Sequence, residues 1–264
     1  MKVDQHSQQA LDGMSEEGDD FADAPAVHAS TLGVALQPIA HPPPEAEKVK
    51  AVREALGAAG GEGWVTEDCI HRYLRAENGK PALAAERIHA TLAWRRDSQP
   101  DNVECTECLK DHRSHDARFI GSDRHGRPCI YSCFAASKAR EPKALLAHFI
   151  SLLEACIQKM PGHVETLIWL VDFTGFSVKE AMDPRFSINL VQLLQAHYPE
   201  RMACIICLGA PKAFSGLWSA VKSLMKENTR RKIMFVKGHE QVCEMPEQLP
   251  SRLKLTVKNS ENAY

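Results

Sequence analysis

The chain has 264 residues, 44% of them hydrophobic and 25% charged, which fits one main globular domain with a smaller one beside it. No run approaches the roughly 20 apolar residues that a membrane-spanning helix needs, so the pattern excludes a membrane-spanning protein. The net charge of −2 combines an acidic first part, where residues 1–45 hold eight acidic residues against Lys2, with a remainder of about +5; this excess is too weak for a nucleic-acid-binding surface but suits contact with anionic lipid headgroups.

The start of the chain predicts no targeting segment. It lacks a basic start followed by an apolar stretch, and it is too acidic for an Arg-rich transit peptide. The composition of residues 1–45 is poor in aromatic and β-branched side chains and ends in a proline run. We therefore expect a disordered acidic leader and a cytoplasmic location.

The first ordered part is predicted to be helical. Apolar residues recur at helical spacing from about 44 to 59, until glycines end the pattern. Thr66 can cap a second helix that runs through Arg75, and a third runs from Pro81 to about Arg96. Residues 46–100 are therefore predicted to form a small helical unit.

The pattern then changes to alternating strands and helices. The predicted strands are residues 129–134, 167–172, 203–209 and 233–236, and the predicted helices lie near 142–160, 177–197 and 213–227. Strands that alternate with helices in this way indicate a largely parallel sheet. The predicted fold class is α/β, with a main domain over residues 105–258.

The nine cysteines are expected to be reduced, because the count is odd and no secretion signal is evident. Cys204 and Cys207 lie in an apolar strand, where side chains three apart point to opposite faces and cannot share one metal. A second pattern offers candidate zinc ligands at Cys105, Cys108, His112 and His115. Its histidines follow too soon for the usual finger spacing, so a polar loop is the favoured interpretation and no metal is predicted.

Catalytic motifs are scarce. There is no GxSxG elbow, HExxH pair, phosphate-binding loop or dinucleotide fingerprint. Asp172 ends a strand and could be a catalytic carboxylate at the strand's carboxyl end, although capping of the segment that follows is the simpler interpretation. The chain is not expected to be an enzyme.

An apolar stripe at helical spacing follows Gly209 and leads into the basic run of residues 230–232. It consists of Phe214, Leu217, Trp218, Val221, Leu224 and Met225. Taken alone, such a stripe is most often core packing.

Six motifs in order resemble the Sec14-like, or CRAL-TRIO, lipid-binding family over about residues 48–250. They are the YLRA helix and the helix ending in Trp94-Arg95 within residues 73–97, DRHGRP at 123–128, the strand ending in Asp172 with Gly175 beyond, YPERM at 198–202, the strand leading to Ala210-Pro211, and ENTRRKI at 227–233. The resemblance implies a sheet that floors an apolar lipid pocket. It also implies that the stripe helix gates this pocket by swinging outward at a membrane.

The resemblance further implies a phosphoinositide headgroup site at Glu200, Thr229 and Lys232. Lys232 would neutralise the phosphodiester, and Thr229 would donate a hydrogen bond to it. Glu200 would accept a hydrogen bond from an inositol hydroxyl or hold Lys232 in place, and a structural ion pair between the two is the alternative.

The sequence departs from the family pattern at several places. Glu77 stands where some phosphoinositide-binding members have a second basic residue, and its carboxylate would repel a phosphate. Leu167 and Trp169 stand where phosphatidylcholine-binding members present hydroxyls. The Leu-Gly-Gly ending is replaced by LPSRLKL at residues 249–255, so an irregular last strand is expected.

The leading hypothesis is a monomeric carrier of one phospholipid, phosphatidylinositol first, that contacts membranes transiently and needs no cofactor. A carrier of another hydrophobic ligand, of tocopherol, retinoid or sterol type, keeps the same fold. A scaffold with an empty pocket and an acidic leader that recruits a partner is a third possibility. A hydrolase that uses Asp172 or a cysteine comes last.

Overall fold

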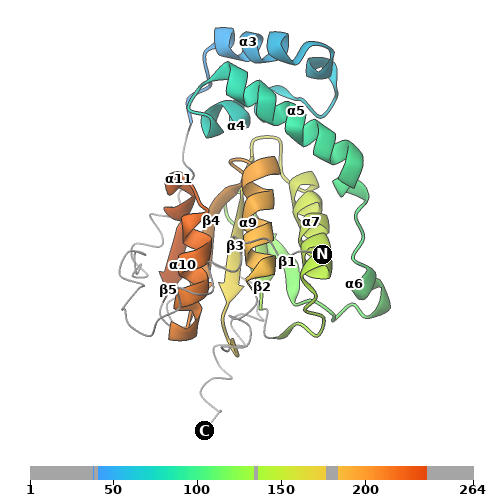
Figure 1. The fold of residues 1–264 in the computed structure, drawn as a ribbon, viewed down its shortest axis with the longest axis vertical. Helices are drawn as coiled ribbons and strands as arrows, with labels where there is room; N and C mark the ends of the chain where they lie inside the picture. The colour runs from blue at the N-terminus through green and yellow to red at the C-terminus, as the bar shows by residue number, and fades with distance from the viewer. Residues whose placement is uncertain (1–37, 39–40, 134–135, 177–183, 237–264) are drawn as a thin grey trace, which may run out of the picture.

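The chain folds as a small helical unit set above an α/β domain (Figure 1). This computed structural model describes Pro38 and residues 41–133, 136–176 and 184–236. Most of the expected leader, the first part of the helix expected at 177–197, and the ending at 249–255 lie outside the described residues. No helix in the described ranges is long and apolar enough to cross a membrane.

The helical unit contains α3 (Ala46–Leu56), η1 (Gly57–Gly61), α4 (Glu67–Ala76), α5 (Pro81–Ser98) and η2 (Pro100–Asn102). Thr66 caps α4 as expected, because its hydroxyl accepts a hydrogen bond from the backbone N–H of Cys69 at 3.2 Å. The three helices share a core that includes the fully buried Val52, Ile70 and Ile88. Helices therefore occupy the positions at which the sequence analysis expects them.

Within the described residues, the sheet has five strands in the order β1-β2-β3-β4-β5. They are β1 (Ala117–Ser122), β2 (Pro128–Ser132), β3 (Leu167–Asp172), β4 (Met202–Leu208) and β5 (Ile233–Val236). Strands β2 to β5 pair in parallel, and β1 pairs antiparallel with β2. The four expected strands and the largely parallel sheet are confirmed. The sequence analysis missed β1, a half-exposed edge strand with a glycine near its end.

A tight turn built by the DRHGRP motif joins β1 to β2. The Asp123 carboxylate accepts hydrogen bonds from the backbone N–H groups of His125 and Arg127, both at 2.9 Å, and pairs with the Arg127 guanidinium at 2.6 Å. Gly126 has a φ of +77°, and a Cβ there would lie 3.3 Å from Pro161. Only glycine meets both demands without strain.

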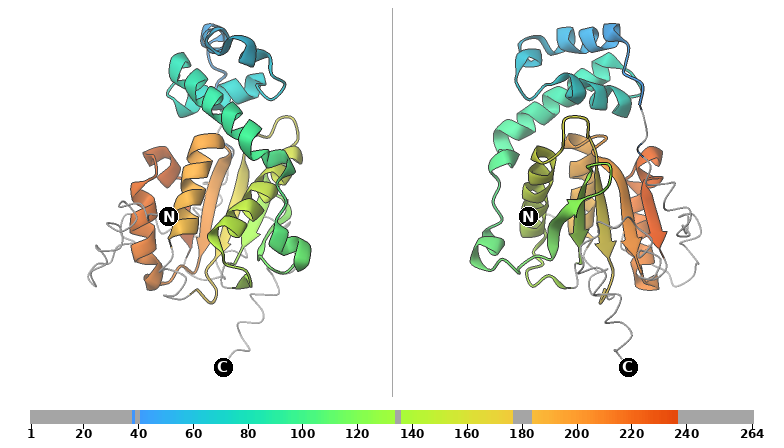
Figure 2. Two further views of the ribbon diagram at one scale, coloured as in Figure 1. Left: turned by 45° about the vertical axis from the view of Figure 1, so that its right-hand side comes forward. Right: turned by 180° about the vertical axis from the view of Figure 1, so that it is seen from behind.

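Three helices cover one face of the sheet (Figure 2). They are α7 (Pro142–Gln158), α9 (Arg185–His197) and α10 (Ser215–Ser223), the last preceded by η4 (Lys212–Phe214); α6 (Thr106–Lys110) and α11 (Glu227–Arg230) are single short turns. Because consecutive parallel strands are also neighbours, right-handed crossovers place these three connecting helices on the same side.

The two faces of the sheet belong to different apolar clusters. Trp169 packs under the helices with Phe149 of α7 and Phe186 of α9, and Ile168 packs in the cluster on the other face. Cys207 belongs to the helix-side cluster and Cys204 to the opposite one. This confirms that the CxxC spacing of β4 cannot hold one metal.

The helical unit is joined to the α/β domain through buried polar contacts. Glu154 of α7 accepts hydrogen bonds from the Tyr198 hydroxyl at 2.7 Å and from the Arg95 guanidinium at 2.8 Å. Trp94 of α5 stacks on the ring of His197, with centroids 4.3 Å apart. These contacts tie α5 to α7 and to the end of α9.

The surroundings of His197 lead to a prediction about how the stability of the fold depends on pH. Burial, with the positive charges of Arg87 and Arg95, lowers the pKa of His197 to about 4. The unfolded state, with a histidine pKa near 6.5, then binds more protons below neutrality. The contribution of His197 to the free energy of unfolding is therefore fully present above about pH 6.5 and is lost as the pH falls towards 4. Because the ring is partly exposed, we expect this group to lower the free energy of unfolding by only about 1 kcal/mol between pH 7 and pH 5.

Urea unfolding at pH 7 and pH 5 measures this effect. The His197→Gln variant should lose less stability between the two pH values than wild type does. The matched control His89→Gln, which alters an exposed histidine of α5, should keep the wild-type difference. An unchanged difference in His197→Gln would contradict the assignment.

Candidate headgroup site

The three residues expected to bind a headgroup line one cavity of about 90 Å³. The Lys232 ammonium donates a hydrogen bond to a carboxylate oxygen of Glu200 at 2.8 Å, and both side chains are less than a quarter exposed. Thr229 lies on the same wall. Glu200 precedes β4 and Lys232 precedes β5, so the parallel pairing of these strands brings the two residues together at the amino ends of the strands.

Glu200 has an unusual backbone conformation. Its φ is +56°, a left-handed value that costs a non-glycine residue about 1–2 kcal/mol. The turn that holds it is closed by the Arg201 backbone N–H, which donates to the Tyr198 carbonyl at 3.3 Å. Strain of this kind concentrates at binding sites, so it supports a functional reading of Glu200.

The cavity has one apolar and one polar side. Its apolar lining includes Val191, Leu194, Met202, Ile205 and Met225. Its polar lining includes Arg75, Arg87, Gln195, Lys226 and Asn228 beside the three expected residues. A ligand with a charged head and an apolar tail therefore has partners for both parts.

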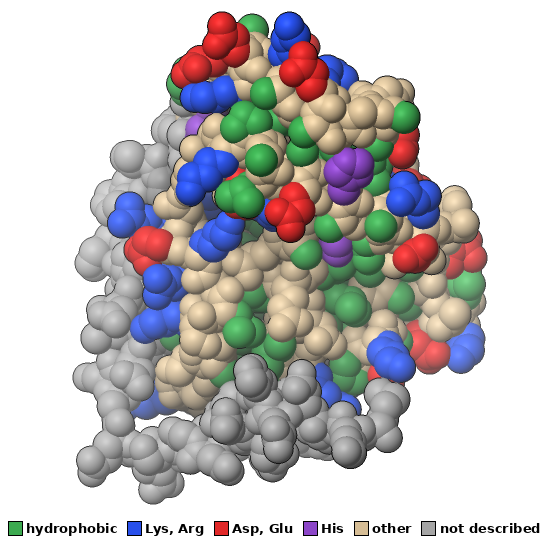
Figure 3. Space-filling model, turned by 45° about the horizontal axis from the view of Figure 1, so that its top comes forward, with side chains coloured by type: hydrophobic (Ala, Val, Ile, Leu, Met, Phe, Trp, Pro, Cys, Tyr) green, Lys and Arg blue, Asp and Glu red, His purple; other side chains and the backbone are tan. Residues whose placement is uncertain are grey.

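Glu200 and Lys232 also border a second, larger cavity of about 1250 Å³. Its basic lining includes Arg75, Arg124, Arg127 and Arg231, and its acidic lining Glu165 and Glu200. We call this cavity the basic basin. Along the left side of Figure 3, below the helical unit and near α10 and α11, several Lys and Arg side chains gather on the surface. The Glu200–Lys232 pair thus stands between a small amphipathic cavity and a wide basic one.

Three arginines contact Glu165 beside the basin, two at its carboxylate and one at its backbone carbonyl. The Glu165 carboxylate pairs with Arg72 at 3.1 Å and with Arg75 at 2.6 Å. Burial alone would raise the pKa of Glu165, but these two guanidinium groups lower it below its ordinary value. Burial and the charge of Arg72 lower the pKa of Arg201 to about 10, and its guanidinium donates to the Glu165 carbonyl at 2.9 Å.

The resulting excess of positive charge favours an anionic ligand. Within the described residues, the Nε of Arg75 is buried without a hydrogen-bond partner and is therefore a spare donor. The sequence analysis did not select Arg75, although it lies in the YLRA motif, whose arginine could have signalled it.

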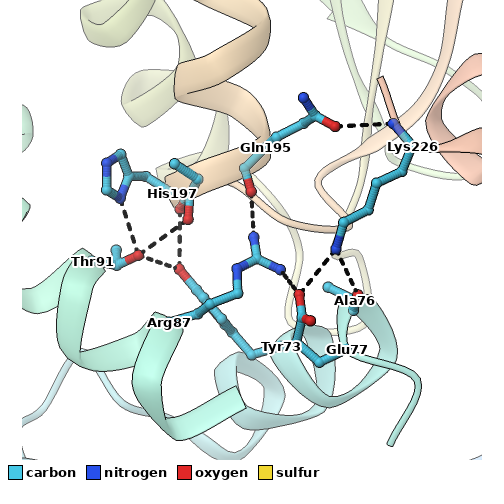
Figure 4. A network of polar contacts seen from close by, with 9 residues as sticks. Tyr73, Ala76, Glu77, Arg87, Thr91, Gln195, His197 and Lys226 are labelled. Atoms are coloured by element: carbon cyan, nitrogen blue, oxygen red, sulfur yellow. Dashed lines mark hydrogen bonds and ion pairs between the residues drawn. The ribbon is translucent and has the colours of Figure 1, made fainter. Parts of the chain in front are cut away.

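Glu77, the acidic departure from the family pattern, is part of a polar network (Figure 4). Its carboxylate pairs with Arg87 of α5 and with the Lys226 ammonium at 3.1 Å. Burial alone would raise the pKa of Glu77, but hydrogen bonds and charges from Lys226 and Arg87 lower it. The carboxylate is therefore neutralised by two cations, which removes the repulsion expected from the sequence.

The same network reaches the end of the stripe helix. Arg87 donates to the Gln195 carbonyl, and the Gln195 side chain binds the Leu224 carbonyl at 2.9 Å and the Lys226 backbone N–H at 3.1 Å. The contacts of Glu77, Gln195 and Lys226, which we call the latch, connect the helical unit, α9 and the segment after α10 (Figure 4).

The apolar stripe is mostly buried. Leu217, Trp218 and Val221 are 5–7% exposed, Phe214 and Met225 are half-buried, and Leu224 is 40% exposed. Phe214 contacts the Phe173 and Phe176 rings edge to face, and Trp218 packs in the same way on Phe235, with centroids 5.1 Å apart. In this structure α10 is closed against the sheet and α9.

The closed stripe leaves little room beside the expected headgroup residues. Pockets that hold drug-sized ligands measure roughly 300–1,000 Å³, well above the 90 Å³ found there. A further cavity of about 10 Å³ under α7 and α9 is lined by Leu167 and Trp169 among other apolar residues. The Trp169 indole N–H donates to the Ser132 hydroxyl at 2.8 Å. The large apolar lipid pocket stays a prediction that requires α10 to move.

Asp172 has structural partners. One carboxylate oxygen accepts from the Tyr131 hydroxyl at 2.7 Å, and the other accepts from the Thr174 backbone N–H at 2.8 Å. Burial, followed by the contact with Asp172, raises the pKa of Tyr131. The carboxylate caps the turn after β3, which favours the simpler of the two interpretations of this residue.

The cysteine and histidine pattern at residues 105–115 is only partly brought together. Cys105, Cys108 and His115 cluster, and His148 of α7 completes a group whose four ligand atoms lie within 4.8 Å of one another. The group does not include His112, which is exposed. His148 could not be selected from the sequence because it lies 40 residues from Cys108.

Comparisons with known proteins identify relatives of this chain. A CRAL-TRIO domain-containing protein of Schizosaccharomyces pombe is 31% identical over 172 residues, which are 65% of this chain and 17% of that protein. The phosphatidylinositol transfer protein PDR17 of Saccharomyces cerevisiae is 24% identical, with 70% of this chain and 56% of that protein covered. The SEC14 cytosolic factor of Candida glabrata is 25% identical, with 77% and 73% covered.

The chain spans less than half the length of the first three curated relatives it matches. The crystal structure of Sfh5 is similar in fold, with a TM-score of 0.56 at 16% identity over 67% of this chain and 68% of that one. The family model for the CRAL/TRIO domain matches residues 115–254, more than half of the sequence. The chain therefore belongs to the CRAL/TRIO domain family.

Proposed function

We propose that the chain binds one phospholipid, phosphatidylinositol first, and carries or presents it between membranes. The observation that carries the proposal is the position of the Glu200–Lys232 pair between an amphipathic cavity and the basic basin. The names of two relatives, a phosphatidylinositol transfer protein and a SEC14 cytosolic factor, agree with it.

The headgroup chemistry follows from the residues around the pair. A phosphodiester beside Lys232 would form a charge-assisted hydrogen bond, and Thr229 would donate a second bond. The buried Nε of Arg75 supplies another donor on the same cavity. Glu200, released in part from Lys232, would accept from an inositol hydroxyl, which a choline headgroup does not offer. This difference favours inositol lipid.

Lipid entry requires α10 to swing away from the sheet. Exposing an acyl carbon to water costs about 0.8 kcal/mol. A path that opens directly onto a bilayer avoids this cost for every carbon of the chain. The stripe would exchange its contacts with Phe173 and Phe235 for contacts with lipid during this opening. The basic residues near α10 and α11 would favour an anionic membrane surface.

The latch should slow this opening. A partly exposed ion pair such as that of Glu77 with Lys226 is worth about 0.5–1 kcal/mol, so removing it should speed lipid transfer about two- to fivefold. Lys226→Ala and Glu77→Gln change the net charge in opposite directions, and both should accelerate transfer between liposomes. Changes of opposite sign would point to net charge instead and would contradict the latch.

Transfer of labelled phosphatidylinositol and phosphatidylcholine between liposomes tests the proposed function. The full chain should move the inositol lipid faster than spontaneous exchange does and faster than the choline lipid. Transfer of a tocopherol, retinoid or sterol in place of both would overturn the headgroup assignment. Absence of transfer and of membrane binding would favour the scaffold.

A further inference from the structure

We propose that Cys105, Cys108, His115 and His148 form a structural zinc site that ties α6 and the loop after it to α7. The site lies outside the headgroup cavity and is independent of the proposed lipid. Its ligands come from three places: the α6 turn, the residues just before β1, and the middle of α7.

The distances fit a tetrahedral ion. The His115 Nδ1 lies 3.3 Å from the Cys105 sulfur and 3.4 Å from the Cys108 sulfur, and the His148 Nδ1 lies 3.4 Å from the Cys108 sulfur. Zinc bonds of about 2.3 Å to sulfur and 2.0–2.1 Å to nitrogen at tetrahedral angles put sulfur and nitrogen about 3.5 Å apart. Binding therefore requires small adjustments of the side chains.

Hydrogen bonding fixes the His148 tautomer. The Nε2 of His148 lies 2.7 Å from the Ala117 carbonyl, which can only accept, so Nε2 carries the proton. In the neutral ring, Nδ1 then presents a lone pair towards the Cys108 sulfur. A ligand imidazole whose other nitrogen donates to a carbonyl is the usual outer arrangement of zinc sites.

Without a metal, the four side chains of this cluster cannot satisfy one another's hydrogen-bonding groups well. The single His115 Nδ1 faces two sulfurs and can form one good in-plane hydrogen bond, while its Nε2 is buried without a partner in the described part of the chain. An unsatisfied buried nitrogen costs about 1–3 kcal/mol, which a metal bond at Nδ1 would offset.

The charges of the complex also balance. Zinc binding releases the two thiol protons to solvent, so Zn²⁺, two thiolates and two neutral imidazoles give a site with no net charge. A neutral complex suits a position where Cys105 and His115 are only 7% and 5% exposed. Four protein ligands leave no open coordination position, which indicates a structural role and not a catalytic one.

The surrounding backbone holds the ligands in place without the metal. The Ser114 hydroxyl donates to the Glu107 carbonyl at 2.9 Å, and the Ser114 carbonyl accepts from the backbone N–H groups of Lys138 and Ala139, both at 2.9 Å. These bonds fix the return of the chain from α6 to His115. The site is therefore preorganised by contacts outside its four ligands.

Metal analysis of the full chain, expressed with added zinc and purified without a histidine tag, tests the proposal. Wild type should contain about one zinc per chain, and Cys105→Ser with Cys108→Ser should contain less than about a tenth of that. His112→Ala changes an exposed histidine of the same loop and should keep the full zinc content. The Cys204→Ser variant removes a buried cysteine of the other CxxC pair and should also keep it.

A second measurement uses wild type alone, so its result does not depend on whether the variants fold. Zinc added to the reduced, metal-free chain should protect Cys105 and Cys108, and no other cysteine, from alkylation, and should raise the melting temperature. The proposal would be overturned if purified wild type contained no zinc and if added zinc did not protect Cys105 and Cys108 from alkylation. Zinc that persists in the double cysteine variant would place the metal elsewhere and would overturn it as well.

Discussion

Replacing Lys232 with alanine is expected to slow phosphatidylinositol transfer roughly 30-fold, the effect of losing about 2 kcal/mol from a charge-assisted hydrogen bond. The loss should be large because the ammonium is mostly buried and lies 2.8 Å from Glu200. Without it, the phosphate would meet the Glu200 carboxylate uncompensated. Rates of transfer between liposomes of fixed composition and salt concentration measure the effect.

Two controls separate headgroup binding from general attraction to membranes. Lys50→Ala removes the same charge from an exposed position on α3 and should transfer lipid at the wild-type rate. Lys232→Arg keeps the charge and should recover part of the transfer. Wild-type transfer by a folded Lys232→Ala variant would show that the pair with Glu200 is only structural.

Replacing Trp218 with alanine is expected to reduce the free energy of unfolding by about 3–5 kcal/mol, the usual cost of truncating a buried tryptophan. The side chain is 5% exposed and packs between Phe214 and Phe235. Its indole nitrogen is buried without a hydrogen-bond partner in the described residues, and losing that unfavourable group offsets part of the cost. The expected value is therefore near the lower limit of the range.

Urea unfolding measures this cost, with Leu224→Ala as the control inside the same stripe. Leu224 is 40% exposed, so its truncation should change stability by less than about 0.5 kcal/mol. A small effect at Trp218 would mean that α10 does not rest closed on the sheet in solution. The contrast between the two variants therefore tests the closed state directly.

The sequence was a good guide where local patterns decide the structure. The cap at Thr66, the proline that opens α5 and the continuous apolar run of β3 each predict their element because short-range interactions determine them. Strand β1 escaped because an edge strand with few buried residues lacks that pattern.

Contacts between distant segments set the limits of prediction at the candidate site. The latch joins Glu77 to Lys226 across 149 residues, and no local pattern marks such a pair. Glu77 could therefore be recognised as an acidic departure, but its neutralisation by Arg87 and Lys226 could not. His148 was missed for the same reason, since the distance between ligands in the fold is unrelated to their spacing in the chain.

Mass spectrometry of the lipids extracted from the purified full chain tests the central claim most directly. The account predicts enrichment of phosphatidylinositol over the host's phosphatidylcholine, at up to one lipid per chain, with the enrichment lost in Lys232→Ala. A different hydrophobic molecule retained equally by both proteins, or no lipid in either, would contradict it.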